Sequence, residues 1–227
     1  MTLDPPVDVI YSSPFYRCIQ TLGPFVEKLS AKDGGGNEGT AVVNLEHGIS
    51  EFYGRARFSH PSPAPISVLQ PLFPNLTLQS PAPGPIIVPS PNGESIPQLH
   101  DRLAYTLHHL IQRLDADPSG PRTLLLCTHA AAIIAIGRAL TGRMPEEEGE
   151  EDFRCFTCGV SRFVRREGDG GEGKGVEEGD EIEVWDSQTP DQVPDVRWRG
   201  DRGVGGGWVC EVNSDCSFLE GGEERGW

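Results

Sequence analysis

Two short stretches of the chain place a basic side chain just after the turn that follows an apolar run. Ser13-Pro14 precedes Arg17, and Thr128 precedes His129 and a run of alanines. The guanidinium fork of arginine matches a phosphate group, and the free N–H groups at a helix N-terminus attract the same anion. These residue types predict a phosphate site made of Arg17, His129 and the starts of two helices.

For these residues to meet, the runs before them must be parallel strands whose carboxyl ends share one edge of a sheet. Apolar, β-branched residues predict strands at 7–11, 40–45 and 123–127. Periodic apolar residues predict helices at 17–29, 95–114 and 130–140. Alternating strands and helices favour an α/β fold, here a three-layer αβα arrangement with a mostly parallel sheet.

Prolines and charges are unevenly distributed along the 227 residues. Segment 61–97 holds 11 of the 20 prolines, so we expect a mobile insertion there, without regular helix or central strand. Residues 144–227 hold 9 Lys+Arg and 23 Asp+Glu, a charge of −14 out of the total of −15. We expect acidic loops in this part, alternating with short antiparallel strands at 159–165, 181–185 and 207–212.

The overall charge and hydropathy exclude several classes of function. An acidic chain lacks the clustered positive surface that a nucleic-acid backbone requires, so no direct nucleic-acid contact is expected. The apolar stretches are far shorter than the ~20 residues that span a bilayer, and no basic, then apolar, signal stands at the start. A cytoplasmic or nuclear protein with no membrane contact is expected.

The motifs resemble those of the histidine phosphatase superfamily, whose members have the phosphoglycerate-mutase-like fold. S-S-P-x-x-R-C-x-Q-T at 12–21 is similar to the family's second signature, and T-H-A-A at 128–131 to its second-histidine motif. Residues 43–52 (V-N-L-E-H-G-I-S-E-F) resemble the segment that supplies an acid/base carboxylate. The N-G-E-S-I-x-x-L-x-x-R run at 92–102 also fits, and the resemblance covers most of residues 7–219.

The resemblance implies a role for each matching residue. Arg17 corresponds to a phosphate clamp and His129 to the second histidine, both in the catalytic set. Glu51 corresponds to the proton donor, with Glu46 as the competing candidate. The residues expected to bind substrate lie in the two turns: Arg17, Ser13 and Ala130. No cofactor is implied, because the family's chemistry is independent of metal.

One part of the family's pattern has no counterpart in this sequence. Family members carry an R-H-G motif on a first strand, and its histidine attacks phosphorus. Only six residues precede Val7, and no R-H-G occurs before Arg17. We expect one domain over 1–227, lacking the first strand and helix, with insertions at 61–97 and 167–183. A truncated gene model or isoform explains this pattern best, and a genuine short, inactive relative is the alternative. Without the nucleophile the covalent route is expected to be closed.

Two functions remain open. A full-length form would hydrolyse phosphomonoesters, on a small molecule or a protein, through a phosphohistidine. Alternatively, the acidic tail and the C-F-T-C, W-x-C and N-S-D-C sequences resemble fungal relatives of the histidine-phosphatase-like tau subunit of the RNA polymerase III transcription factor TFIIIC. That resemblance implies a non-catalytic assembly role, with other TFIIIC subunits as partners.

Four cysteines leave a further alternative open. Cys155, Cys158, Cys210 and Cys216 have the ligand type of a zinc site, but the second spacing is unusual for zinc. The simpler interpretation is two pairs of thiols on neighbouring strands.

Overall fold

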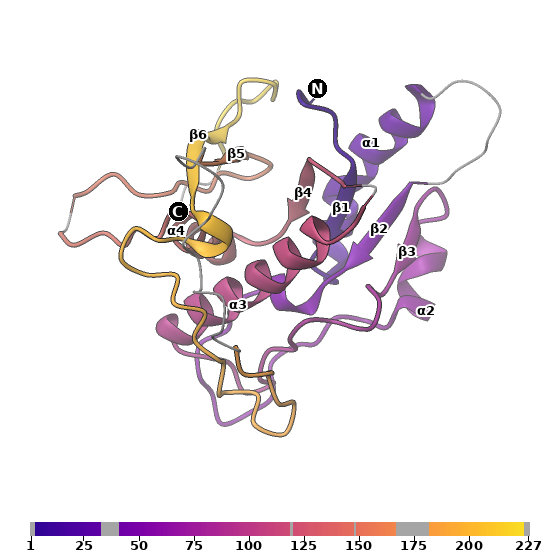
Figure 1. Ribbon diagram of the computed structural model, residues 1–227. Coiled ribbons are helices and arrows are strands. Elements are labelled where there is room, and N and C mark those ends of the chain that lie inside the picture. Colours follow the sequence, from indigo (N-terminus) through magenta and orange to yellow (C-terminus); the bar gives the residue numbers. More distant parts are fainter. Residues whose placement is uncertain (1–2, 33–40, 119, 148, 167–181, 225–227) are drawn as a thin grey trace.

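Four parallel strands form the central sheet of the computed structural model, which describes residues 3–32, 41–118, 120–147, 149–166 and 182–224. Their order is β3-β2-β1-β4 (Figure 1), and each neighbouring pair is parallel. The strands are β1 (Val9–Ser12), β2 (Val42–Leu45), β3 (Thr77–Gln79) and β4 (Leu124–Cys127). The predicted α/β fold with a mostly parallel sheet is therefore confirmed.

Helices cover both faces of this sheet. They are α1 (Tyr16–Lys32), α2 (Ile66–Leu69), α3 (Ile96–Asp115) and α4 (Ala130–Thr141). Successive strand residues point to opposite faces, and Ile10 and Tyr11 of β1 accordingly belong to different hydrophobic clusters. The Ile10 cluster contains residues of α1 and α2, whereas the Tyr11 cluster contains residues of α3 and α4. The three-layer arrangement follows from this alternation.

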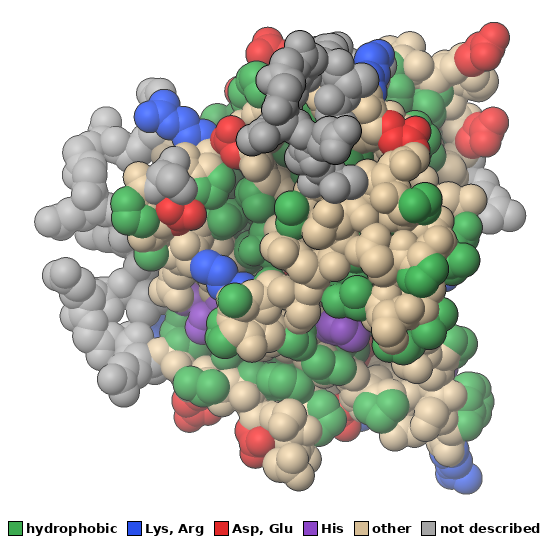
Figure 2. All heavy atoms as spheres, turned by 90° about the vertical axis from the view of Figure 1, so that its right-hand side faces the viewer, with side chains coloured by type: hydrophobic (Ala, Val, Ile, Leu, Met, Phe, Trp, Pro, Cys, Tyr) green, Lys and Arg blue, Asp and Glu red, His purple; other side chains and the backbone are tan. Residues whose placement is uncertain are grey.

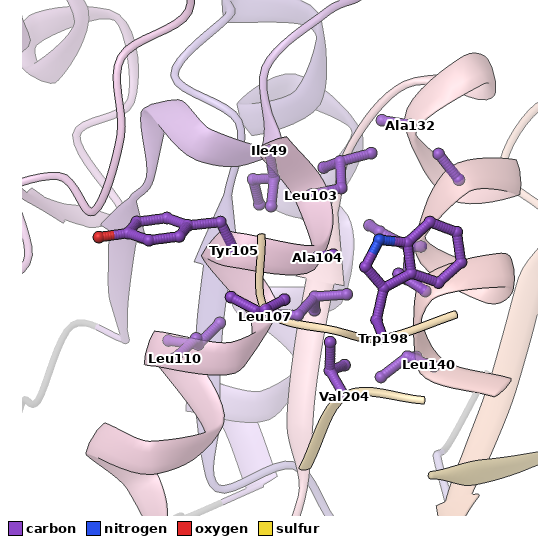
Figure 3. Packing of buried hydrophobic residues seen from close by; sticks show 14 of the residues in the cluster. Ile49, Leu103, Ala104, Tyr105, Leu107, Leu110, Ala132, Leu140, Trp198 and Val204 are labelled. Atoms are coloured by element: carbon purple, nitrogen blue, oxygen red, sulfur yellow. The ribbon is translucent and has the colours of Figure 1, made fainter. Parts of the chain in front are cut away.

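The longest helix begins and packs as its sequence predicts. Ser95 accepts a hydrogen bond from the backbone of Gln98, whose side chain accepts one from the backbone of Ser95, a capping box. Figure 3 shows leucines of α3 facing α4, with Trp198 inserted beside Leu140. Trp198 is 1% exposed. The acidic second half of the chain thus contributes to the same core as α3.

The Pro-rich segment has more regular structure than expected. It contains α2, a 3₁₀ turn (η2, Gln70–Leu72) and β3, which extends the sheet. The prediction of an insertion without helix was wrong, because its prolines fall where helices start and β3 is an edge strand. Most charged side chains on the face carrying β3 and α2 lie toward its rim (Figure 2).

Two of the three predicted short strands are present. They are β5 (Val160–Arg165) and β6 (Trp208–Asp215), which pair antiparallel, with a 3₁₀ turn (η3, Val204–Gly206) before β6. Residues 182–185 are irregular, so the predicted strand there was wrong; the backbone N–H of Trp185 donates to the Tyr105 hydroxyl instead. Residues 167–181, which make up most of the Gly-rich acidic segment predicted at 167–183, lie outside the described residues.

No helix in the described ranges combines the length and apolar character needed to cross a bilayer.

Candidate functional site

The carboxyl ends of β1, β2 and β4 meet at one edge of the sheet. Ser12, the last residue of β1, is in register with both Leu45 and Cys127. The ladder continues one step further, since Ser13 N–H donates to the Cys127 carbonyl at 2.8 Å. Side chains that follow these three strands are therefore neighbours, as the sequence predicted.

His129 is the buried centre of this edge. It is the N-cap residue of α4, so Ala130 opens that helix beside it. His129 Nε2 lies 2.8 Å from Ser13 Oγ, and Nδ1 lies 3.1 Å from Glu51 Oε2. Arg17 donates from Nη2 to the same Glu51 oxygen at 2.9 Å. The structure thus brings together Ser13, Arg17, Glu51, His129 and Ala130.

Exposure rises from the centre of the site to its rim. The side chain of His129 is 3% exposed, that of Glu51 24% and that of Arg17 53%. Phe15 stacks edge-on against the His129 ring at 5.5 Å between centroids, and the Arg17 guanidinium lies 4.9 Å above Phe15. Arg17 can therefore move into solvent, whereas His129 is held in place.

The contact between His129 and Glu51 Oε2 shifts the pKa of both residues. Burial disfavours the charged form of His129, but hydrogen bonds and negative charge from Cys18 and Glu51 outweigh it and raise its pKa. Burial likewise opposes ionisation of Glu51, yet His129 and Arg17 lower its pKa. His129 Nδ1 therefore lies between two charged groups, 3.1 Å from Glu51 Oε2 and 3.2 Å from Arg17 Nε.

The competing carboxylate, that of Glu46, is bound by backbone groups and does not face Arg17 and His129. It is fully buried, and its carboxylate accepts hydrogen bonds from the backbone N–H groups of Gly48 and Ile86 at 2.8 to 3.1 Å. Burial raises its pKa despite these bonds. Glu46 fastens the Pro-rich segment to the turn His47–Ile49 (η1), and Glu51 is the carboxylate that faces Arg17 and His129.

A buried ion pair behind the acid segment was missed by the sequence analysis. Arg102 of α3 is 1% exposed, and it pairs with Glu94 at 2.6 Å. It also donates to the carbonyl oxygens of Gly48 and Ser50. These bonds fix the backbone that leads into Glu51. An arginine within the apolar stripe of α3, eight residues after a glutamate, was the available signal.

Cys18 adds an unexpected thiol to the site. Its Sγ lies 3.5 Å from His129 Nε2 and 3.6 Å from the Thr128 carbonyl oxygen. A hydrogen bond with the Cys127 thiol lowers the pKa of Cys18 against the effect of burial.

The candidate zinc ligands do not form a metal cluster. No group of three or more metal-ligating side chains occurs among the residues that the structure describes. Cys155 and Cys216 are buried and Cys158 is exposed. Desolvation raises the pKa of Cys155, Cys210 and Cys216.

Comparison with known proteins places these features in a family. The transcription factor tau 55 kDa subunit of Saccharomyces cerevisiae is 28% identical over 232 residues, covering 100% of this chain and 47% of that protein. The chain thus spans about half the length of this relative.

Among solved structures, the ecdysone phosphate phosphatase EPPase from Bombix mori, in complex with tungstate, matches with a TM-score of 0.46 and 16% identity. The match covers 65% of this chain and 52% of that one. Residues 3–174 match the family model of the histidine phosphatase superfamily (branch 1), and the chain belongs to that superfamily.

Proposed function

We propose that this domain binds the dianion of a phosphate monoester at Arg17 and His129. The observation that supports it is the convergence of both basic side chains on one carboxylate oxygen of Glu51, at 2.9 Å and 3.1 Å. A carboxylate oxygen and a phosphate oxygen accept the same charge-assisted hydrogen bonds. The Ser13 hydroxyl and the N-terminus of α4 at Ala130 supply further donors to such an oxygen.

The second part of the proposal is that the chain binds phosphate without turning it over. Hydrolysis through a phosphohistidine needs a nucleophilic histidine at phosphorus, and this sequence contains no R-H-G motif. Of the other five histidines, four make ring contacts elsewhere, on the residues Tyr53, Trp198, Tyr105 and each other. The fifth, His47, lines a pocket with Pro14 and Leu45. For a form that carries the motif, we propose Glu51 as the proton donor to the leaving oxygen, as the family resemblance implies.

Phosphate titration by calorimetry tests the binding. Inorganic phosphate and phenyl phosphate are expected to bind the wild-type chain and to bind Arg17→Ala at least tenfold more weakly. Arg143→Ala is the matched control, because Arg143 is exposed beyond the far end of α4. Equal affinity of Arg17→Ala and wild type would refute the site. Turnover of p-nitrophenyl phosphate that disappears in His129→Ala would refute the non-catalytic part.

A second candidate function is assembly. The similarity to the yeast tau 55 kDa subunit runs over the whole chain, and the sequence motifs resemble the tau subunit of TFIIIC. We infer a nuclear protein that joins other TFIIIC subunits, in which the proposed phosphate site recognises rather than processes its ligand. Affinity purification of the tagged chain from its own cells should recover those subunits; their absence would refute this role.

A further inference from the structure

The loop that leaves the phosphate site leads to an exposed aromatic side chain flanked by arginines. We propose that the ligand is a phosphorylated peptide segment whose acidic and apolar side chains dock on this loop, residues 53–60, here called the aromatic loop. The inference rests on the proposed phosphate site and specifies its substrate class. The phosphate would meet Arg17 and His129, and neighbouring peptide residues would meet Arg55, Arg57 and Phe58.

A continuous path of rings connects the site with the surface. Phe15 contacts His129 at 5.5 Å and Tyr53 at 6.4 Å between ring centroids. Tyr53 stacks on His60 at 4.7 Å with an interplanar angle of 9°, and His60 contacts Phe58 at 5.2 Å. Phe58, at the outer end, is 67% exposed. The outer end of the path thus offers one aromatic ring to a partner, at the end of a chain of rings that begins beside His129.

The aromatic loop is held in place before any ligand arrives. Ala56 N–H donates to the Asn92 carbonyl at 2.8 Å, and His60 N–H donates to the Pro91 carbonyl at 2.7 Å. The Asn92 side chain donates in turn to the Phe58 carbonyl at 3.1 Å. Because the backbone on both sides of Phe58 is already fixed, binding there costs less conformational entropy than binding to a free loop.

The local charge determines which partner fits. The aromatic loop, Y-G-R-A-R-F-S-H, contains two arginines and no acidic residue, in a chain with a net charge of −15. Arg55 and Arg57 are both exposed, and Arg17 lies at the inner end of the same ring path. This small positive area suits a peptide that carries one phosphate and a few carboxylates.

Two other ligand classes fit this surface less well. A nucleic acid requires a longer cationic track, and the remaining negative charge of the chain would repel its backbone. A small phosphorylated metabolite would occupy the phosphate site but would leave Phe58 without a contact. The exposed ring therefore favours the peptide.

Fluorescence anisotropy on the full chain tests the proposal. The probes are a fluorescein-labelled peptide with phosphoserine between leucine and aspartate residues, its unphosphorylated copy, and a single-stranded oligouridine of similar length. The phosphopeptide is expected to bind at least tenfold more tightly than inorganic phosphate. Phe58→Ala, or the double variant Arg55→Ser/Arg57→Ser, should weaken it about tenfold and leave affinity for inorganic phosphate unchanged.

Matched controls separate this effect from misfolding and from general charge. Val209→Ala removes an apolar side chain of β6 that is 51% exposed, and Arg143→Ser/Arg154→Ser removes two exposed arginines elsewhere. Both should bind the phosphopeptide like wild type. If Phe58→Ala also binds like wild type, or if oligouridine binds more tightly than the peptide, the inference is overturned. Phosphate binding that depends on Arg17 would then still support the proposed function.

Discussion

Two arginine–glutamate pairs hold the segment 48–51: a rear pair, Arg102–Glu94, and a front pair, Arg17–Glu51. Only the front pair is substantially exposed to water. In the rear pair, Arg102 is 1% exposed and Glu94 8%. In the front pair, Arg17 is 53% exposed and Glu51 24%. The residue types and the N–O distances, 2.6 Å and 2.9 Å, are closely similar.

Burial gives the two pairs different tasks. In the rear pair, the Arg102 guanidinium is divided between the Glu94 carboxylate and two backbone carbonyls, so it has a complete set of partners. If Arg102 exchanged Glu94 for another ligand, the buried Glu94 carboxylate would be left without its cation. In the front pair, Arg17 and His129 share one carboxylate oxygen at the edge of solvent, and under the proposed function a phosphate oxygen replaces it. The rear pair therefore holds the backbone, and the front pair can bind.

The largest expected effect comes from breaking the rear pair. Arg102→Met leaves the Glu94 carboxylate buried without its cation and the carbonyls of Gly48 and Ser50 without a donor. We expect the free energy of unfolding in denaturant to fall by about 3–5 kcal/mol. Arg17→Met is the control at the front pair and should cost less than about 1 kcal/mol.

The stranded charge can be separated from lost packing. Arg102→Met/Glu94→Met removes both charges, so it should recover part of the stability lost in the single variant. A single Arg102→Met variant as stable as wild type would show that the two pairs do not differ in kind.

A smaller effect is expected from removing the carboxylate charge of the front pair. Glu51→Gln removes the internal anion that competes for Arg17 and His129, so inorganic phosphate should bind more tightly, by up to about fivefold (about 1 kcal/mol). Calorimetry measures this directly, with Glu150→Gln as an exposed control carboxylate. Weaker phosphate binding in Glu51→Gln would mean that Glu51 contributes to the bound state instead of competing with the ligand.

The positions of Arg17 and His129 were predictable from the sequence, but the choice of Glu51 as their partner and the rear pair were not. Arg17 and His129 follow apolar strands at motif positions, so the parallel sheet alone places them at one edge. The choice between Glu46 and Glu51 depended on the N–H of Ile86, 40 residues away, which occupies Glu46. No local pattern records that contact.

The Pro-rich segment was mispredicted for a related reason. Local propensity argues against structure there, but Leu76 and Leu78 are buried against the α1 side of the sheet. Pairing of β3 with β2 then supplies hydrogen bonds that the propensities do not anticipate. Tertiary burial overrides local preference at such an edge strand.

The smallest effect concerns pH and reports on the contact between His129 and Glu51. NMR titration should give His129 a pKa above the ordinary 6.5, falling in Glu51→Gln because the carboxylate no longer stabilises the imidazolium. His100 stacks on Trp198, and burial lowers its pKa, so it should titrate identically in both proteins.

The same two shifts determine how stability depends on pH. The raised pKa of His129 stabilises the fold below pH 6.5, and this contribution is lost as pH rises through the folded-state pKa. The lowered pKa of Glu51 stabilises it above pH 4.5, and that contribution is lost as pH falls through the folded-state value. The stability difference between wild type and Glu51→Gln should thus be largest between about pH 4.5 and 6.5. A difference independent of pH would mean that packing, and not the electrostatic contact with His129, holds Glu51 in place.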